Sequence, residues 1–217
     1  MLVCGIDEAG RGPVIGPMSI CSVILDESGA KEIKDMGVRD SKRLSAGKRE
    51  SMEPRIKELA LEWKLAMVLP AEIDLLRKRM SLNQIEAEKM AFLIESHSMR
   101  PEKVIVDAAD SVAENFGERI RVILKTNGSH IPLIVSEHKA DDRYIEVSAA
   151  SVIAKVARDR AIELLRVEYG EIGSGYPSDE VTMEYVRKAA RAGDLPHFVR
   201  RSWITVKRSN QTSLGEF

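Results

Sequence analysis

The sequence predicts an α/β fold in which a mixed sheet carries helices on its faces. Three strand-like segments come first, and from residue 70 onwards helical and strand-like segments alternate along the chain. The composition, with 44% hydrophobic and 31% charged residues among 217, is that of an ordinary globular protein with a good core. We therefore expect one domain, or one domain with a small appendage.

Five short segments have the pattern of strands, either as continuous apolar runs or as an alternation of side chains. They lie at residues 2–6, 18–25, 63–69, 103–106 and 131–135. The second is expected to pair back on the first, because Pro13 and Pro17 confine the turn between them.

The helices are expected where apolar residues recur at roughly helical spacing. They lie at residues 46–61, in a short stretch opened by Pro70, and at residues 83–97, 112–124 and 147–169. Ser45 is placed to cap the first of these helices, and a proline at the first helical position suits the second. The last is the longest, and its many small residues permit close packing.

Charge and apolar content indicate a cytosolic protein without a membrane anchor. No apolar run approaches the ~18 residues of a membrane span, and the N-terminus lacks the pattern of a signal peptide. Cys4 and Cys21 lie in apolar strand-like runs without metal-ligand spacing, so we expect buried free thiols.

Basic residues gather near the C-terminus, although the formal net charge of the chain is only −1. Residues 187–208 hold one acid, Asp194, against seven bases: Arg187, Lys188, Arg191, Arg200, Arg201, Lys207 and Arg208. Such a run is commonly a solvated surface, and it indicates nucleic acid only where it lies beside a site.

Two adjacent carboxylates, Asp7 and Glu8, end the first apolar run, and Gly10-Arg11-Gly12 follows them. Buried charge is unfavourable unless a metal or a partner compensates for it. The glycines leave a backbone whose N–H groups can approach a ligand closely, with a forked cation between them. The alternative is an edge strand ending in a polar turn whose acids are solvated.

Two further acids stand at strand ends, where ligands bind in open α/β sheets. Asp107 ends the fourth strand and Asp141 lies beyond the fifth. Carboxylates ~4 Å apart repel by roughly 4 kcal/mol at an effective dielectric near 20, so a cluster of four needs hard cations. All-oxygen ligation favours Mg²⁺ or Mn²⁺ and supports two-metal phosphoryl transfer. Asp110, read as a helix cap, and Asp142, read as a solvated neighbour, are the rival acids.

Five motifs in order carry a resemblance to a known family. They are Asp7-Glu8-Ala9-Gly10-Arg11-Gly12-Pro13, Asp40-Ser41-Lys42, Val106-Asp107-Ala108, Lys139-Ala140-Asp141 followed by Val147-Ser148-Ala149-Ala150-Ser151, and Gly173-Ser174-Gly175-Tyr176-Pro177-Ser178-Asp179. Together they resemble the motif set of ribonuclease HII, in its archaeal single-chain branch. The resemblance implies a ribonuclease H-like fold, a five-stranded mixed sheet flanked by helices with a small helical C-terminal extension.

The resemblance also implies site residues and an organisation of the chain. It makes Asp7, Glu8, Asp107 and Asp141 the catalytic acids and metal ligands. It gives Gly10, Arg11 and Gly12 contact with the ribonucleotide's 2′-hydroxyl and phosphate, and Tyr176 contact with the sugar at the RNA-to-DNA junction. It places a catalytic domain at residues 1–170, a helical extension packed on it at 171–209 and a flexible tail at 210–217.

The expected function is hydrolysis of the RNA strand of RNA/DNA hybrids and cleavage on the 5′ side of single ribonucleotides in duplex DNA. A two-metal mechanism would leave 3′-hydroxyl and 5′-phosphate ends. Lys42 is expected to hold phosphate, and His138 is a weaker candidate for proton transfer. The alternatives are a noncatalytic hybrid-binding protein and another carboxylate nuclease of the same fold. We expect a monomer.

The C-terminal residues 210–217 resemble the peptide that binds the sliding clamp. Gln211, Leu214 and Phe217 fall in the register of that pattern, although its usual second aromatic residue is missing. A helical turn in such a peptide brings apolar side chains to one face. The alternative is a frayed terminus with a chance match.

Overall fold

The computed structural model describes residues 1–38 and 44–214, and for residues 210–214 it describes the backbone only. The chain divides into two compact units, which we describe separately. Unit 1 comprises Met1–Ala9, Ser19–Ala66 and Ser81–Ala157. Unit 2 comprises Gly10–Met18, Met67–Met80 and Arg158–Phe217.

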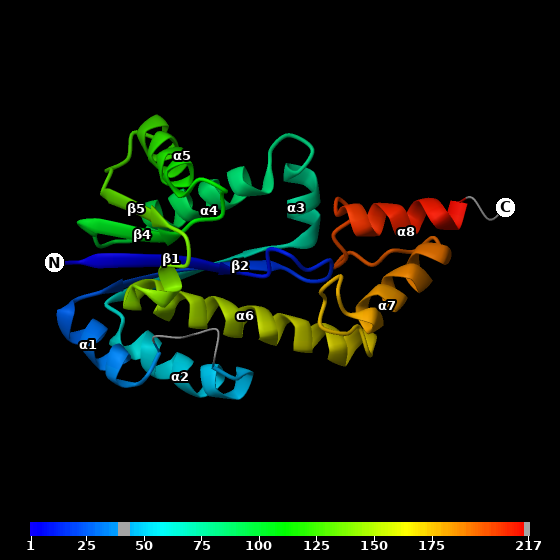
Figure 1. Cartoon of the computed structure of the whole chain (residues 1–217), viewed down its shortest axis with the longest axis horizontal. Coiled ribbons are helices and arrows are strands. Elements are labelled where there is room, and N and C mark those ends of the chain that lie inside the picture. The colour runs from blue at the N-terminus through cyan, green and yellow to red at the C-terminus, as the bar shows by residue number, and fades with distance from the viewer. Residues whose placement is uncertain (39–43, 215–217) are drawn as a thin grey trace. The chain divides into compact units, whose positions relative to one another are not determined.

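A mixed sheet forms the centre of unit 1 (Figure 1). Its strands, in the order β3-β2-β1-β4-β5, are β3 (Glu62–Val68), β2 (Met18–Leu25), β1 (Val3–Ala9), β4 (Lys103–Asp107) and β5 (Leu133–Glu137). β1 runs antiparallel to β2 and parallel to β4, and β4 runs parallel to β5. The expected pairing of the second strand with the first is confirmed.

The five expected helices are present, and among the described residues there are also α1, a 3-10 turn, and two helices in the C-terminal region where the resemblance implies a helical extension. They are α1 (Glu27–Asp35), α2 (Ala46–Leu59), α3 (Pro70–Leu76), α4 (Leu82–Ser96), α5 (Ala113–Thr126), the 3-10 turn η1 (Ala140–Asp142), α6 (Ile145–Tyr169), α7 (Glu180–Arg191) and α8 (Ile204–Leu214). The oxygen of Ser45 accepts a hydrogen bond from Lys48 N–H, so the predicted cap is confirmed. α1 was not expected, because only Gly29 and Ile33 of its nine residues are buried.

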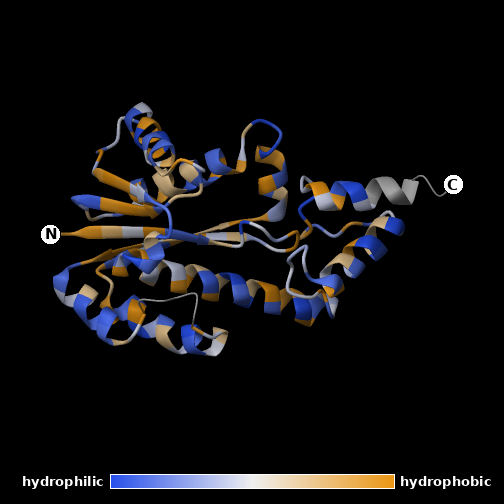
Figure 2. Ribbon diagram, viewed as in Figure 1, coloured by the Kyte–Doolittle hydropathy of each residue, from blue (hydrophilic) through white to orange (hydrophobic). Residues whose placement is uncertain are grey.

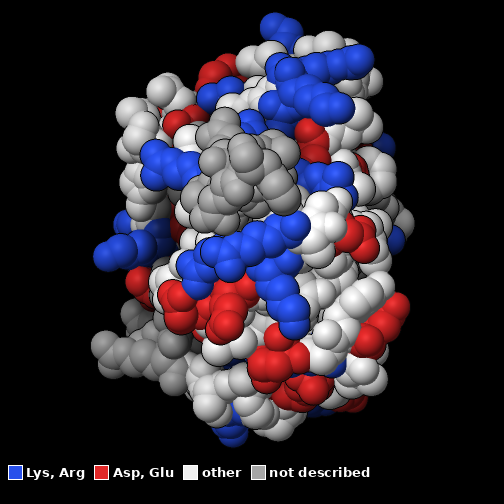
Figure 3. All heavy atoms as spheres, turned by 90° about the vertical axis from the view of Figure 1, so that its right-hand side faces the viewer, with Lys and Arg blue, Asp and Glu red and all other residues white. Residues whose placement is uncertain are grey.

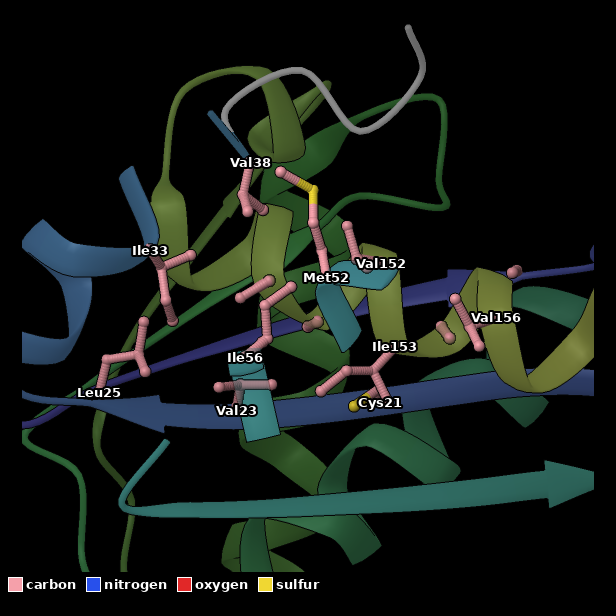
Figure 4. Packing of buried hydrophobic residues seen from close by; sticks show 14 residues of the cluster. Cys21, Val23, Leu25, Ile33, Val38, Met52, Ile56, Val152, Ile153 and Val156 are labelled. Atoms are coloured by element: carbon pink, nitrogen blue, oxygen red, sulfur yellow. The ribbon is translucent and has the colours of Figure 1, made fainter. Parts of the chain in front are cut away.

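The core of unit 1 lies between the sheet and α1, α2 and α6 (Figure 4). Cys21, Val23 and Leu25 alternate along β2 with side chains that face the other way, which is the period of a strand. Met52 and Ile56 of α2 pack on the same side. Each fully buried side chain of this size contributes roughly 1.5–3 kcal/mol, so this packing holds the sheet and its strand ends in place.

The opposite face of the sheet is covered by α4 and α5. Ser22, the neighbour of Cys21, directs its hydroxyl oxygen to Nε2 of His97, just after α4, at 2.8 Å. In Figure 2 orange and blue residues alternate along the helices, as expected of helices with one apolar face. Cys4 and Cys21 are buried free thiols, as predicted.

Unit 2 has its own apolar core, built from segments far apart in the sequence. Val14 and Ile15 pack with Ile162 of α6, Val186 of α7 and Phe198. An isolated bridge pairs Ile15 with Val199. The segment that follows Asp7 and Glu8 in the chain thus packs against C-terminal residues.

The division into residues 1–170, 171–209 and 210–217 remains a prediction. Within residues 1–38 and 44–214, no helix is long and apolar enough to cross a membrane.

Candidate active site

Asp7 and Glu8 lie on β1, just beyond the last residue of β1 that pairs with β4. The pairing of β1 with β4 runs from Val3 with Lys103 to Ile6 with Val106. Extending that register by one residue puts Asp7 beside Asp107. On its other edge β1 pairs with β2 as far as Ala9, so the strand continues through both acids rather than ending before them.

Asp7 is the buried member of the pair, with 4% of its surface exposed. Its Oδ1 accepts a hydrogen bond from the backbone N–H of Glu8 at 2.8 Å. Burial raises the pKa of the Asp7 carboxyl well above its usual value, and the charges of Glu8 and Asp107 raise it further. These three carboxylates therefore lie close enough for the charges of Glu8 and Asp107 to act on Asp7.

Asp141 reaches the same strand ends through the turn after β5. The backbone N–H of Ala140 donates a 2.9 Å hydrogen bond to Oδ1 of Asp107. Lys139 has a φ of 56°, a left-handed conformation that is uncommon for a residue other than glycine. Asp141 is 2% exposed, whereas its neighbour Asp142 is exposed. The choice of Asp141 over Asp142 thus agrees with their burial.

The donor set fits a hard divalent cation, because carboxylate oxygens are its preferred ligands. A cation would offset the repulsion that raises the pKa of Asp7. Among residues 1–38 and 44–214, however, no three His, Cys, Asp or Glu side chains form a ready metal site. The roles of Asp7, Glu8, Asp107 and Asp141 as ligands remain a prediction.

Two residues of α6, Ser151 and Lys155, also act on Asp7, and neither has a role predicted from the sequence. A hydrogen bond from Ser151 and the charge of Lys155 each lower the pKa of Asp7, which opposes the effect of burial. Lys155 Nζ lies 2.7 Å from Ser151 Oγ. Their spacing of four residues puts them on one face of the helix. This spacing is the feature of the sequence that could have identified them as a pair.

The Gly10-Arg11-Gly12 turn belongs to unit 2. Gly10 has a φ of +88°, as expected of a glycine in a tight turn, and a Cβ there would lie 2.6 Å from the Arg158 side chain. Gly12 does not have a positive φ. Its backbone conformation therefore does not require a glycine, contrary to the expectation from the sequence. A Cβ on Gly12 would meet the ring of Tyr176 at 3.8 Å. The turn and the tyrosine therefore lie side by side.

The loop of Tyr176 is held by buried polar contacts. Gly173 and Gly175 both have positive φ, and Thr182 Oγ1 accepts a hydrogen bond from Gly175 N–H at 2.9 Å. Arg158 lies over the Tyr176 ring, with Cζ 5.0 Å from its centre, and donates to the carbonyl of Ser174. Tyr176 as a residue is 40% exposed, so it is accessible to a ligand.

Other predicted residues have different places. Asp110 is not the cap of α5, whose N-cap is Val112; it instead forms an ion pair with Arg119 at 3.0 Å. Nε2 of His138 lies 3.3 Å from the carbonyl oxygen of Ser111, and His138 is exposed. Lys42 and Phe217 lie outside the described residues. Gln211 and Leu214 fall within α8.

The C-terminal basic run is only partly a surface. Lys188, Arg191, Arg201, Lys207 and Arg208 are exposed, whereas Arg200 is fully buried. Figure 3 shows many Lys and Arg side chains on the face it presents. The surface residues suit contact with phosphates, and Arg200 has a different role.

Comparison with known proteins gives consistent matches over the whole chain. The sequence pattern of the family Ribonuclease HII matches residues 4–206. Ribonuclease HII of Thermococcus onnurineus is 43% identical, over 100% of this chain and 99% of the relative. Among solved structures, ribonuclease H2 from Pyrococcus horikoshii OT3 is 41% identical, with full coverage of both chains and a TM-score of 0.91.

A second solved structure is a complex. It is that of PCNA with RNase HII from Archaeoglobus fulgidus, and its matching chain is 35% identical to this one. The match covers 94% of this chain and 95% of that one, with a TM-score of 0.84. The predicted ribonuclease H-like fold is thereby confirmed.

Proposed function

The chain belongs to the ribonuclease HII family, and we propose that it hydrolyses the RNA strand of RNA/DNA hybrids and cuts on the 5′ side of single ribonucleotides in duplex DNA. The observation that supports this most directly is the burial of Asp7 against the charges of Glu8 and Asp107. Such an arrangement is unfavourable by itself and is typical of a site that takes up cations.

Asp7, Glu8, Asp107 and Asp141 would hold two divalent cations, Mg²⁺ or Mn²⁺. When bound, these ions make water a stronger nucleophile and stabilise the leaving 3′-oxygen. The hydrogen bond from Ala140 N–H keeps the Asp107 carboxylate at the end of β4. Ser151 and Lys155 favour the charged form of Asp7, which is the form that binds a cation.

The turn at Gly10, Arg11 and Gly12 would read the ribose. Only Ala9 separates Glu8 from Gly10 in the sequence, so recognition residues follow the acids directly along the chain. The 2′-hydroxyl distinguishes RNA from DNA at a single position, and a backbone N–H can donate to it. Tyr176, beside Gly12, offers an exposed ring face for the sugar at the junction.

The C-terminal residues would bind a sliding clamp. The support is twofold: the register of Gln211, Leu214 and Phe217 in the sequence, and the complex of the Archaeoglobus fulgidus relative with PCNA. Tethering to a clamp raises the local concentration of an enzyme that must find rare ribonucleotides.

A duplex with one embedded ribonucleotide tests the activity. We expect cleavage on the 5′ side of that ribonucleotide with Mg²⁺ or Mn²⁺ and none with chelator, with 3′-hydroxyl and 5′-phosphate products. An all-DNA duplex of the same sequence is the control. Equal cleavage of both duplexes would indicate a general carboxylate nuclease, and binding without cleavage would indicate a hybrid-binding protein.

A further inference from the structure

Arg200 is fully buried in unit 2, and it is among the largest side chains to be so. Its Nε donates a hydrogen bond to the carbonyl of Gly16 at 2.9 Å, and its Nη1 donates to the carbonyl of Arg11 at 3.2 Å. A buried guanidinium is unfavourable unless it is hydrogen-bonded. Here the backbone of the segment that contains the Gly10-Arg11-Gly12 turn supplies those acceptors.

Trp203 makes the next contact along the same turn. Its Nε1–H donates to the carbonyl of Gly12 at 3.2 Å, and its ring centre lies 4.9 Å from Cζ of Arg200. The carbonyls of two consecutive residues, Arg11 and Gly12, are thus held by two side chains that also contact each other.

These contacts determine the direction of a donor. In a trans peptide the C=O and the following N–H point in opposite directions. Since the carbonyl of Arg11 points to Arg200, the N–H of Gly12 points away from it. The next residue is Pro13, which has no N–H, and Gly12 is exposed beside the Tyr176 ring.

The segment that carries both side chains is itself held firmly. Asp74 accepts hydrogen bonds from the N–H groups of Arg201 and Ser202, both at 2.8 Å. The N–H of Arg200 donates to the carbonyl of Val14, also at 2.8 Å. Such anchoring is what a rigid support of a recognition turn requires.

We propose that Arg200 and Trp203 are positioning residues that orient the Arg11–Gly12 peptide, so that the Gly12 N–H faces the 2′-hydroxyl of a ribonucleotide. The inference rests on the proposed function, in which this turn reads the ribose. It assigns to the C-terminal segment a part in discriminating RNA from DNA, beyond any attraction of its surface charges for phosphate.

Two conservative variants test it. Trp203→Phe keeps an apolar ring and removes only the indole donor, and Arg200→Lys keeps the charge but loses the two-pronged donation. Trp63→Phe and Arg55→Lys, both in unit 1, control for the same chemical changes elsewhere. Affinity is measured by fluorescence anisotropy with Ca²⁺, on a duplex with one ribonucleotide and on its all-DNA counterpart. Thermal unfolding shows that each variant is folded.

We expect Trp203→Phe and Arg200→Lys each to reduce the preference for the ribonucleotide about tenfold, the usual worth of one well-aligned hydrogen bond. Affinity for the all-DNA duplex should not change. With Mg²⁺, the loss in cleavage should appear mainly in KM. The control variants should keep the full preference.

The outcomes separate the inference from the proposed function. If the wild-type protein itself neither prefers nor cleaves the ribonucleotide duplex, the proposed function fails. If the wild-type protein shows the preference and both folded variants retain it, the positioning role is overturned. An equal loss of affinity for both duplexes also overturns it, because it would show a general effect on binding. If Arg200→Lys fails to fold, Trp203→Phe decides by itself.

Discussion

The backbone N–H of Ala140 donates a 2.9 Å hydrogen bond to Oδ1 of Asp107, although 33 residues separate them. This contact ties the turn that carries Asp141 to the end of β4, where Asp107 acts on the pKa of Asp7. The positions of three predicted ligands are therefore linked. Changing any one of them should therefore affect the others.

Asp7→Asn should abolish turnover while the protein stays folded. Asn removes the charge of the proposed ligand but keeps the shape of the side chain, so the activity loss should exceed the roughly 100-fold seen when only a residue that orients a ligand is changed. Cleavage of a ribonucleotide-containing duplex measures this. Asp142→Asn, at the exposed neighbour of Asp141, is the matched control and should keep near-normal activity. Near-normal activity of Asp7→Asn would remove the metal assignment.

The same variant should alter how stability depends on pH in chelator. The folded state raises the pKa of Asp7, so folding takes up a proton there between the unfolded and the folded pKa. The contribution of Asp7 to stability is present below the unfolded pKa and is lost as the pH rises through the folded pKa. In thermal unfolding from pH 4 to 8, the stability of Asp7→Asn should therefore rise relative to that of the wild-type protein as the pH rises. Parallel curves would contradict this expectation.

Added Mg²⁺ or Mn²⁺ should stabilise the wild-type protein by mass action, by roughly 2.7 kcal/mol at a metal concentration 100 times the dissociation constant. The shift in unfolding temperature should grow as the pH rises, because protons compete with the metal for Asp7, whose pKa is raised. Asp7→Asn should show a much smaller shift. A shift of equal size in both proteins would place the cation elsewhere.

Tyr176→Ala should weaken cleavage at a lone ribonucleotide more than cleavage within a long RNA stretch. At a lone ribonucleotide a single junction contact carries most of the recognition, whereas a stretch offers many positions. Tyr176→Phe keeps the ring face and the contact with Arg158, so it should behave nearly as the wild-type protein. Ratios of kcat/KM on the two substrates measure the effect. Equal losses on both would contradict the proposed contact of Tyr176 with the sugar at the junction.

Glu62, on β3, should contribute to the sensitivity of the protein's stability to acid. Burial raises the pKa of Glu62. Hydrogen bonds, among them those from the N–H groups of Ser98 and Met99, lower it by more, so that the pKa falls to about 2. This depressed pKa gives stability that is present above the unfolded pKa and lost as the pH falls through the folded one. The free energy of unfolding of Glu62→Gln should therefore be lower than that of the wild-type protein by on the order of 2 kcal/mol at pH 7.

Denaturant unfolding at pH 7 and at low pH measures that loss. The difference between Glu62→Gln and the wild-type protein should shrink as the pH approaches 2. Glu58→Gln, at an exposed surface ion pair with Arg55, should cost little at any pH. A pH-independent difference for Glu62→Gln would show that its charge is not the cause.

Deletion of residues 211–217 should leave activity on short oligonucleotides unchanged but abolish co-elution with the sliding clamp of the source organism. A chain in which Gln211, Leu214 and Phe217 alone are replaced by alanine should behave in the same way. Replacement of Thr212, Ser213 and Gly215 is the control that spares the pattern. Undiminished clamp binding by the truncated protein would refute the role of these residues.

Much of the fold is local and could be predicted from the sequence. The strand from residue 18 to 25 agrees with β2 in both bounds, because Pro17 and the polar residues that follow Leu25 limit the apolar run. Ser45 and Pro70 mark helix starts through the chemistry of one turn. The adjacency of Asp7 and Glu8 at the end of an apolar run likewise needs only the sequence to be noticed.

Other features of the protein depend on contacts between residues that are far apart in the chain. Asp110 does not cap α5. Its carboxylate instead forms an ion pair with Arg119, a residue of α5 itself. The parallel register of β1 and β4, extended by one residue, puts Asp7 beside Asp107, and this register joins two strands that are far apart in the chain. Arg200 belongs to a run of bases that is typical of a solvated surface, yet it is buried, and its Nη1 and Nε donate hydrogen bonds to the carbonyls of Arg11 and Gly16. Whether a charge is solvated or buried depends on the partners that folding brings to it, and these lie up to 189 residues away along the chain.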